Sequence, residues 1–223
     1  MSSRRTALLA GGSGLVGRRC LPLLLARYAR VVALGRRRVF PAHERLAEHV
    51  VDFERLAEQA ELLRGDDLFC CLGTTLEAAG SREAFRRVDH DYVVALARLA
   101  HEQGVRRFFL VSALGADAGS RVFYSRVKGE VEKAVGELPF EAVHILRPSL
   151  LLGAREESRP AERVGQLFGR LAGPLFVGPL ARYRAVPAAD VAAALVGCAE
   201  SDAGGVHVHY PRPRAGRRHD PEP

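Results

Sequence analysis

Short runs of apolar residues recur along the chain, and longer stretches with helical spacing lie between several of them. Such runs are typical of strands that are buried on both faces of a sheet. They cover Thr6–Ala10, Val31–Leu34, His49–Asp52, Asp67–Leu72, Phe108–Ser112 and Glu141–Leu146. Helices are expected at Leu15–Tyr28, between the third and fourth runs, and at about residues 89–103 and 122–137. This alternation predicts an α/β protein with a doubly wound parallel sheet.

The pattern loosens after Pro148. Residues Gly153–Pro187 are rich in Gly, Pro and Arg and contain one amphipathic stretch, Ala161–Leu171, so we expect a short lobe that covers a substrate. A final helix at Ala188–Ala199 and a last strand at Val206–Tyr210 follow. We predict a single domain over residues 1–210 and a disordered basic tail over residues 211–223.

Composition and charge exclude several classes of protein. The chain has 223 residues, of which 48% are hydrophobic, which is enough for one substantial core. Its formal charge of +7 comes from scattered arginines, densest at Arg36–Arg38 and in the tail, and no nucleic-acid motif accompanies them. We therefore expect a solvated basic surface and no nucleic-acid partner.

The apolar runs, the first residues of the chain and the cysteines suggest where the chain resides in the cell. No run approaches the roughly 20 apolar residues of a membrane span, and the first residues lack the apolar core of a signal peptide. Cys20, Cys70, Cys71 and Cys198 show no CxxC pair, which indicates buried thiols in a reducing compartment. A cytoplasmic protein without a membrane partner is the expectation.

A glycine-rich turn stands between the first strand and the first helix. Its sequence is Gly11-Gly12-Ser13-Gly14-Leu15-Val16-Gly17, with a glycine at every third position. Glycine permits a tight turn and a close backbone approach, and the free N–H groups of a helix N-terminus bind phosphate. In this context the turn predicts a dinucleotide-binding Rossmann fold.

The end of the second strand indicates which dinucleotide is bound. An acidic residue there would bind the ribose 2′-hydroxyl of NAD, but this chain has Gly35 followed by Arg36, Arg37 and Arg38. A guanidinium can hold a 2′-phosphate with two hydrogen bonds, so NADP(H) is the predicted cofactor. A solvated loop is the alternative for Arg38 and for Arg37.

Other strand ends add candidate cofactor contacts. Asp52 and Phe53 follow the third strand and could contact the amino group and the face of the adenine, although Asp52 could equally be an ordinary strand-end residue. Cys71, Leu72 and Gly73 end the fourth strand, where Gly73 would let the backbone lie against a ribose of the cofactor.

Tyr124 and Lys128 are the candidate catalytic pair. They are four residues apart and therefore share one helix face, and Ser112 ends the preceding strand. Reduction of a carbonyl needs an acid for the developing alkoxide, and an adjacent ammonium lowers the pKa of a tyrosine toward neutrality. Lys128 could also hold the nicotinamide ribose, and Ser112 could polarise the carbonyl.

Histidines and cysteines give no metal prediction. His207 and His209 lie on one face of the last strand, but no third ligand with suitable spacing accompanies them. We expect Cys70 and Cys71 to pack within the strand rather than to form a redox pair.

Several motifs together resemble the atypical short-chain dehydrogenases of the Tat-interacting oxidoreductase type, over residues of about 5 to 200. The motifs are Cys70–Thr75, Val88–Tyr92, Val127–Glu132, Arg147-Pro148 and Glu157–Pro160. The resemblance implies an NADPH-binding Rossmann domain with a Tyr–Lys pair and no settled substrate. It carries a cofactor role to Gly11, Ser13, Gly14, Leu15, Val16, Arg36, Arg37, Asp52, Leu72, Gly73, Tyr124, Lys128 and the backbone near Pro148.

One position departs from the resemblance. Ala113 follows Ser112 where relatives often have a second serine, which puts the catalytic role of Ser112 in doubt. Two functions therefore stay open: an NADPH-dependent reductase of a small carbonyl compound, and an NADPH-binding regulatory protein that acts through a protein partner. A sugar-nucleotide epimerase or dehydratase is disfavoured, because only about 75 residues follow Pro148 and those enzymes carry a larger substrate domain.

Overall fold

The computed structural model describes residues 3–152 and 185–213. The expected substrate lobe, Gly153–Pro187, lies almost wholly outside the described residues. Most of the expected tail from Pro211 onward lies outside them as well.

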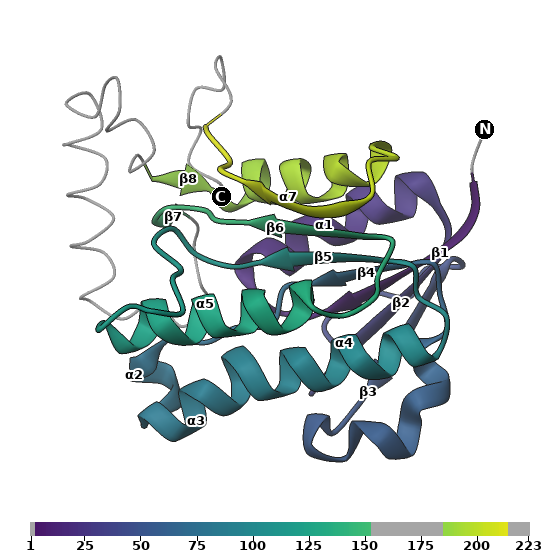
Figure 1. Cartoon of the computed structure of the whole chain (residues 1–223). Coiled ribbons are helices and arrows are strands. Elements are labelled where there is room, and N and C mark those ends of the chain that lie inside the picture. The colour runs from purple at the N-terminus through teal and green to yellow at the C-terminus, as the bar shows by residue number, and fades with distance from the viewer. Residues whose placement is uncertain (1–2, 153–184, 214–223) are drawn as a thin grey trace.

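A seven-stranded sheet forms the centre of the molecule (Figure 1), with the strand order β3-β2-β1-β4-β5-β6-β9. All neighbouring strands run parallel. After β3 the chain returns to the centre and adds β4 on the other side of β1, which confirms the doubly wound fold. The strands are β1 (Ser3–Ala10), β2 (Tyr28–Gly35), β3 (Leu46–Val50), β4 (Asp67–Cys70), β5 (Arg107–Val111), β6 (Ala142–Leu146) and β9 (Gly205–His209).

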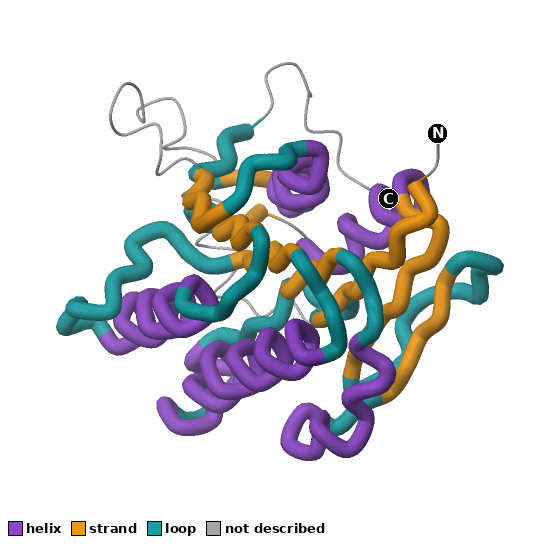
Figure 2. The backbone as a smooth tube through the Cα atoms, turned by 45° about the vertical axis from the view of Figure 1, so that its right-hand side comes forward, coloured by secondary structure: helices purple, strands orange, loops and turns teal. Residues whose placement is uncertain are grey.

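Helices cover both faces of this sheet (Figures 1 and 2). Helices α1 (Leu15–Arg27) and α7 (Ala188–Gly197) pack on one face, whereas α4 (Tyr92–Glu102) and α5 (Phe123–Gly136) pack on the other. Consecutive residues of one strand therefore enter opposite cores: Phe108 joins the α4 and α5 side and Phe109 joins the α1 and α7 side. This explains why the inner strands β4, β5 and β6 are mainly apolar along their length rather than alternating.

Shorter elements complete the described chain. They are η1 (Phe53–Leu63), α2 (Leu76–Ala79), α3 (Arg82–Arg86), the π-helix η2 (Arg87–Asp91), β7 (Leu151–Leu152), β8 (Val186–Pro187) and η5 (Cys198–Glu200). Strands β7 and β8 pair with each other in a separate small sheet. None of the helices in the described ranges has the length and apolar character needed to span a bilayer.

Most element boundaries differ from the sequence prediction by a few residues, as the ends of α1 and β3 illustrate. Helix α1 ends at Arg27 and β2 begins directly at Tyr28, whose ring is buried. Strand β3 ends at Val50 rather than Asp52, because the carboxylate of Asp52 accepts a hydrogen bond from the backbone N–H of Glu54 at 3.0 Å and so caps η1.

A buried polar network joins the amino ends of the central strands. Arg107 donates two hydrogen bonds to Asp67, at 2.6 and 2.8 Å, and the Tyr28 hydroxyl donates a third at 2.5 Å. Arg107 also donates to the carbonyl oxygens of Ala199 and Ser201, at 3.2 and 3.1 Å. The network therefore ties β2, β4 and β5 to the segment after α7.

Candidate functional site

A cleft of about 880 Å³ opens at the carboxyl ends of β1, β4, β5 and β6. Its volume lies within the roughly 300–1,000 Å³ typical of ligand sites, and the strand edge is where doubly wound proteins bind ligands. The predicted site residues among its lining are Gly14, Leu15, Val16, Cys71, Leu72, Gly73, Ser112, Tyr124, Lys128 and Pro148.

The glycine turn brings the start of α1 to this cleft. Gly11 has φ +78°, and a Cβ there would lie 2.5 Å from the backbone carbonyl carbon of Cys71. A Cβ on Gly17 would lie 2.3 Å from the carbonyl oxygen of Gly11. These two glycines allow β1, the end of β4 and the first turn of α1 to approach closely, and Gly14 at the N-cap then borders the cleft with Leu15 and Val16.

A buried ion pair lies beside the cleft. Lys128 Nζ is 2.7 Å from Asp89 Oδ1, with side-chain exposures of 7% and 0%. The other carboxylate oxygen of Asp89 accepts a hydrogen bond from the N–H of Thr74 at 2.8 Å. A Cβ on Gly73 would lie 3.3 Å from Asp89 Oδ1 and 3.7 Å from Lys128 Nζ, so the glycine leaves room for the pair.

The charges beside Tyr124 act in opposite directions. Burial raises the pKa of Tyr124 above its ordinary value; Lys128 opposes this rise and Asp89 adds to it. The net pKa is raised, so the expected lowering by the ammonium is outweighed in this structure. Burial also acts to lower the pKa of Lys128, but Asp89 and Tyr124 outweigh it and the net pKa is raised, which keeps Lys128 charged.

Ser112 occupies a different role from the one expected. Its hydroxyl donates a hydrogen bond to the carboxylate of Glu132 on α5, and this carboxylate also accepts from Arg147 Nε at 3.1 Å. A serine hydroxyl has a single proton, so Ser112 as it stands cannot also donate to a substrate carbonyl. Ala113, the next residue, lines the cleft without a hydroxyl.

Some predicted cofactor residues do not border the cleft. They are Gly11, Ser13, Gly17, Arg36, Arg37, Asp52 and Phe53. Arg36 and Arg37 are exposed where β2 ends, whereas Asp52 caps η1. The ring of Phe53 is 6% exposed and stacks on Tyr92 at 5.8 Å within the core, so its predicted contact with the face of the adenine is not available in this arrangement.

Sequence reasoning gave no role to several residues of the cleft. Asp89 appeared only within a motif of the resemblance, and Arg147 and Tyr210 were not connected with each other. In the structure Arg147 Nη1 donates to the Tyr210 hydroxyl at 3.3 Å. The position of Tyr210 directly after β9 was a usable signal, because ligand sites lie beyond the carboxyl ends of parallel strands.

A family described as NAD(P)H-binding matches residues 11–202 of the chain. Protein HTATIP2 of Rattus norvegicus is 41% identical over 170 residues, which cover 74% of this chain and 70% of that protein. Protein FMP52, mitochondrial, of Coccidioides immitis is 34% identical over 206 residues, 86% of this chain and 84% of that protein. Protein fmp52, mitochondrial, of Aspergillus niger is 38% identical over 179 residues, 76% of each chain.

Solved structures show the same fold at low sequence identity. MoeE5 in complex with UDP-glucose and NAD has a TM-score of 0.70 and 19% identity, over 91% of this chain and 74% of that one. The UDP-N-acetylglucosamine 4-epimerase of Methanobrevibacter ruminantium M1 has a TM-score of 0.71 and 17% identity, over 94% and 77%. These similarities establish the Rossmann fold.

The expected cytoplasmic location is wrong by these comparisons, because several fungal relatives are named as mitochondrial proteins. The prediction relied on the lack of an apolar run long enough to span a membrane and on the cysteine pattern, and neither of these distinguishes a cytoplasmic from a mitochondrial protein. A Rossmann core is equally compatible with either location, so composition carried too little information for this conclusion.

Proposed function

The chain belongs to the NAD(P)H-binding family of atypical short-chain dehydrogenases, and from this premise we propose that it is an NADPH-dependent oxidoreductase that reduces a small carbonyl compound. The observation that carries the proposal is the cleft into which Tyr124 and Lys128 both project, with Lys128 held by a buried carboxylate.

The residues at the glycine turn fit a dinucleotide. Backbone at Gly11 and Gly17 approaches too closely to admit a side chain, and the first turn of α1 opens onto the cleft without an acidic residue. We infer that this turn holds the pyrophosphate. Arg36 and Arg37, exposed where β2 ends, are the groups proposed to bind a 2′-phosphate.

Tyr124 is the proposed acid. When bound, the nicotinamide supplies a hydride to the carbonyl carbon. Tyr124 then donates its phenolic proton to the carbonyl oxygen, and the ammonium of Lys128 stabilises the phenolate that remains. The raised pKa of Tyr124 favours the protonated form that such an acid must have before the reaction.

Ser112 has no part in this proposal, because its hydroxyl already donates a hydrogen bond to the carboxylate of Glu132. The same observation favours the second candidate function, an NADPH-binding regulatory protein that acts through a protein partner. Neither Ser112 nor Ala113 offers a free hydroxyl that could orient a substrate carbonyl. A regulatory protein of this kind is expected to bind NADPH without appreciable turnover.

The two functions are separated by measuring cofactor binding and turnover together. NADPH and NADH are titrated by fluorescence into the wild type and Tyr124→Phe, and both proteins are then screened with aldehydes and ketones. For a reductase we expect NADPH to bind more tightly than NADH, and Tyr124→Phe to bind NADPH normally while losing about 10²–10⁴-fold in kcat.

Tight NADPH binding without any turnover that depends on Tyr124 would favour the regulatory protein. Tighter binding of NADH than NADPH would contradict the role of Arg36, and the variant Arg36→Asp should then leave both affinities unchanged.

A further inference from the structure

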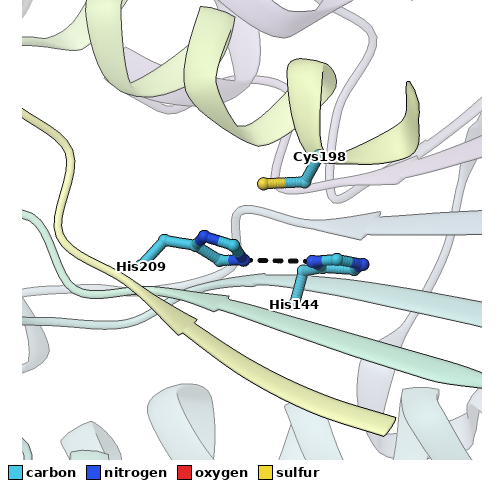
Figure 3. Close-up of side chains that lie close together, drawn as sticks. All are labelled: His144, Cys198 and His209. Carbon is cyan, nitrogen blue, oxygen red and sulfur yellow. Dashed lines mark hydrogen bonds between the residues drawn. The ribbon is translucent and has the colours of Figure 1, made fainter. Parts of the chain in front are cut away.

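Three potential metal ligands meet on the α1 and α7 side of the sheet, away from the catalytic pair. His144 lies on β6, His209 ends β9, and Cys198 begins the η5 turn that follows α7. One ligand atom from each of these side chains lies within 4.8 Å of the other two. Figure 3 shows the two imidazoles side by side with the sulfur of Cys198 above them.

The His144 ring is held in place by stacking. It is 2% exposed and lies between Phe109 and His207, with ring centroids at 5.2 and 5.0 Å. Its Nδ1 forms a hydrogen bond with His209 Nε2 at 3.0 Å, whereas its Nε2 is buried without a partner among the described residues. One of the two hydrogen-bonded nitrogens carries the proton that they share, so a metal ion that binds both would replace this hydrogen bond, and the donor ring would carry its proton on its other nitrogen.

The chemistry of the three groups suits a borderline transition metal. Neutral imidazoles and a thiolate are ligands that Zn²⁺ prefers, whereas Mg²⁺ and Ca²⁺ need oxygen ligands. The nearby charge of Arg107 is balanced by its hydrogen bonds to Asp67.

We propose that His144 Nδ1, His209 Nε2 and Cys198 Sγ bind one Zn²⁺ ion. Zinc bonds of about 2.0–2.1 Å to nitrogen and about 2.3 Å to sulfur place tetrahedral ligands roughly 3.3–3.7 Å apart. The separations of up to 4.8 Å must therefore shorten by about 1 Å, which a rotation of the half-buried Cys198 side chain can supply. On binding, the thiol proton leaves to solvent and the fourth position takes water.

Such an ion would join the end of β9 to the end of α7. His209 precedes Tyr210, which lines the cleft, and the carbonyl oxygen of His209 accepts from the N–H of Arg147 at 2.8 Å. The site is thus one residue away from the cleft wall and separate from the Tyr124 and Lys128 pair.

His207 provides a matched control. It lies on the same strand and face as His209, but its Nε2 contacts the carbonyl oxygen of Gly204 at 2.9 Å, and its ring centroid is 6.4 Å from that of His209. A variant of His207 therefore removes an imidazole from the cluster of rings without removing a proposed ligand.

The test uses the untagged chain of 223 residues after removal of metals with a chelator. Zn²⁺ binding is measured by equilibrium dialysis, and Co²⁺ is added as a spectroscopic probe, with Mg²⁺ as the negative control. We expect one Zn²⁺ per chain and a thiolate-to-cobalt absorption band. Cys198→Ser should lose this band, and both Cys198→Ser and His209→Ala should weaken Zn²⁺ binding about 10-fold or more, whereas His207→Ala should bind normally.

Circular dichroism checks that the variants are folded, and the cobalt spectrum of the wild type tests the proposal without any variant. Absence of stoichiometric Zn²⁺ binding, or of the sulfur band in the wild type, overturns the site. Unchanged Zn²⁺ binding in Cys198→Ser and His209→Ala, or a loss in His207→Ala alone, places the ion elsewhere and overturns it as well.

Discussion

The carboxylate of Asp89 sets the electrostatic character of the proposed catalytic pair, Tyr124 and Lys128. It raises the pKa of the buried ammonium of Lys128 against the lowering by burial, and it also opposes the effect of that ammonium on the pKa of Tyr124. Tyr124 and Lys128 are therefore better described together with Asp89, whose carboxylate keeps Lys128 protonated and makes Tyr124 less acidic.

Replacing Asp89 should destabilise the fold through Lys128. The amide of Asp89→Asn can still accept from Thr74, but it leaves a buried ammonium without a counter-charge, so we expect a loss of about 3–5 kcal/mol in the free energy of unfolding. Urea denaturation of the wild type and Asp89→Asn measures this loss in the free energy of unfolding. The double variant Asp89→Asn/Lys128→Met should lose less than the sum of the two single variants.

Asp91→Asn is the matched control for this prediction. Asp91 lies on the same π-helix, but its side chain is 53% exposed and its partner is His90. We expect a change of less than about 1 kcal/mol. Equal losses in Asp89→Asn and Asp91→Asn would show that the buried pair has no special importance.

At the scale of elements, the contact between α5 and the loop after β5 shapes the wall of the cleft. A Cβ on Gly129 would lie 2.1 Å from the backbone nitrogen of Ala118 and 2.2 Å from the carbonyl carbon of Asp117. This loop also carries Leu114 and Gly115, which line the cleft. The glycine directly after Lys128 therefore sets how closely the loop approaches α5.

Gly129→Ala should push this loop away from α5. We expect a loss of about 1–3 kcal/mol in stability and weaker NADPH binding. Thermal unfolding and fluorescence titration provide the two measurements. Gly136→Ala on the same helix is the control, because the nearest atom would be Val206 Cγ2 at 3.7 Å, an ordinary contact, and it should be neutral or stabilising by up to about 1 kcal/mol. A stable Gly129→Ala variant would contradict the steric argument.

The elements themselves were largely predictable from sequence, because local apolar periodicity determines which segments become buried strands and helices. The expected strand at Phe108–Ser112, for example, matches β5 (Arg107–Val111) to within one residue. Contacts between distant segments were not predictable in this way. Asp89 with Lys128, Ser112 with Glu132, and the meeting of His144 with Cys198 have no spacing that a linear pattern could show.

At the scale of the whole molecule, the hydrogen-bonded network around Asp67 makes the stability of the fold depend on pH in the alkaline range. Burial, followed by the charge of Asp67 and the hydrogen bond to it, raises the pKa of Tyr28 far above its ordinary value. A group whose pKa is raised in the folded state contributes stability below its unfolded-state pKa, which is near 10 for tyrosine. This stability is lost as the pH rises above that value. The same direction holds for Tyr124 and Lys128.

The chain should therefore lose stability above about pH 10, and Tyr28 should account for part of the loss. Tyr28→Phe removes one hydrogen bond, so we expect it to be about 1 kcal/mol less stable than the wild type at neutral pH. Its stability should fall less steeply than that of the wild type above pH 10. Urea midpoints measured from roughly pH 8 to 11 give both curves, and parallel curves would contradict a role for Tyr28 ionisation.

The close approach at Gly11 affects how a mutational scan of this chain should be interpreted. Any side chain at position 11 collides with the backbone of Cys71, and any at position 17 collides with Gly11. Both positions should thus reject substitution in a screen that scores only folding or abundance. Loss of folding on substitution of Gly11 or Gly17 would therefore reflect the packing of backbone segments and not the loss of a cofactor contact. Substitutions at Arg36 and Tyr124 are the ones whose effects distinguish cofactor use from folding.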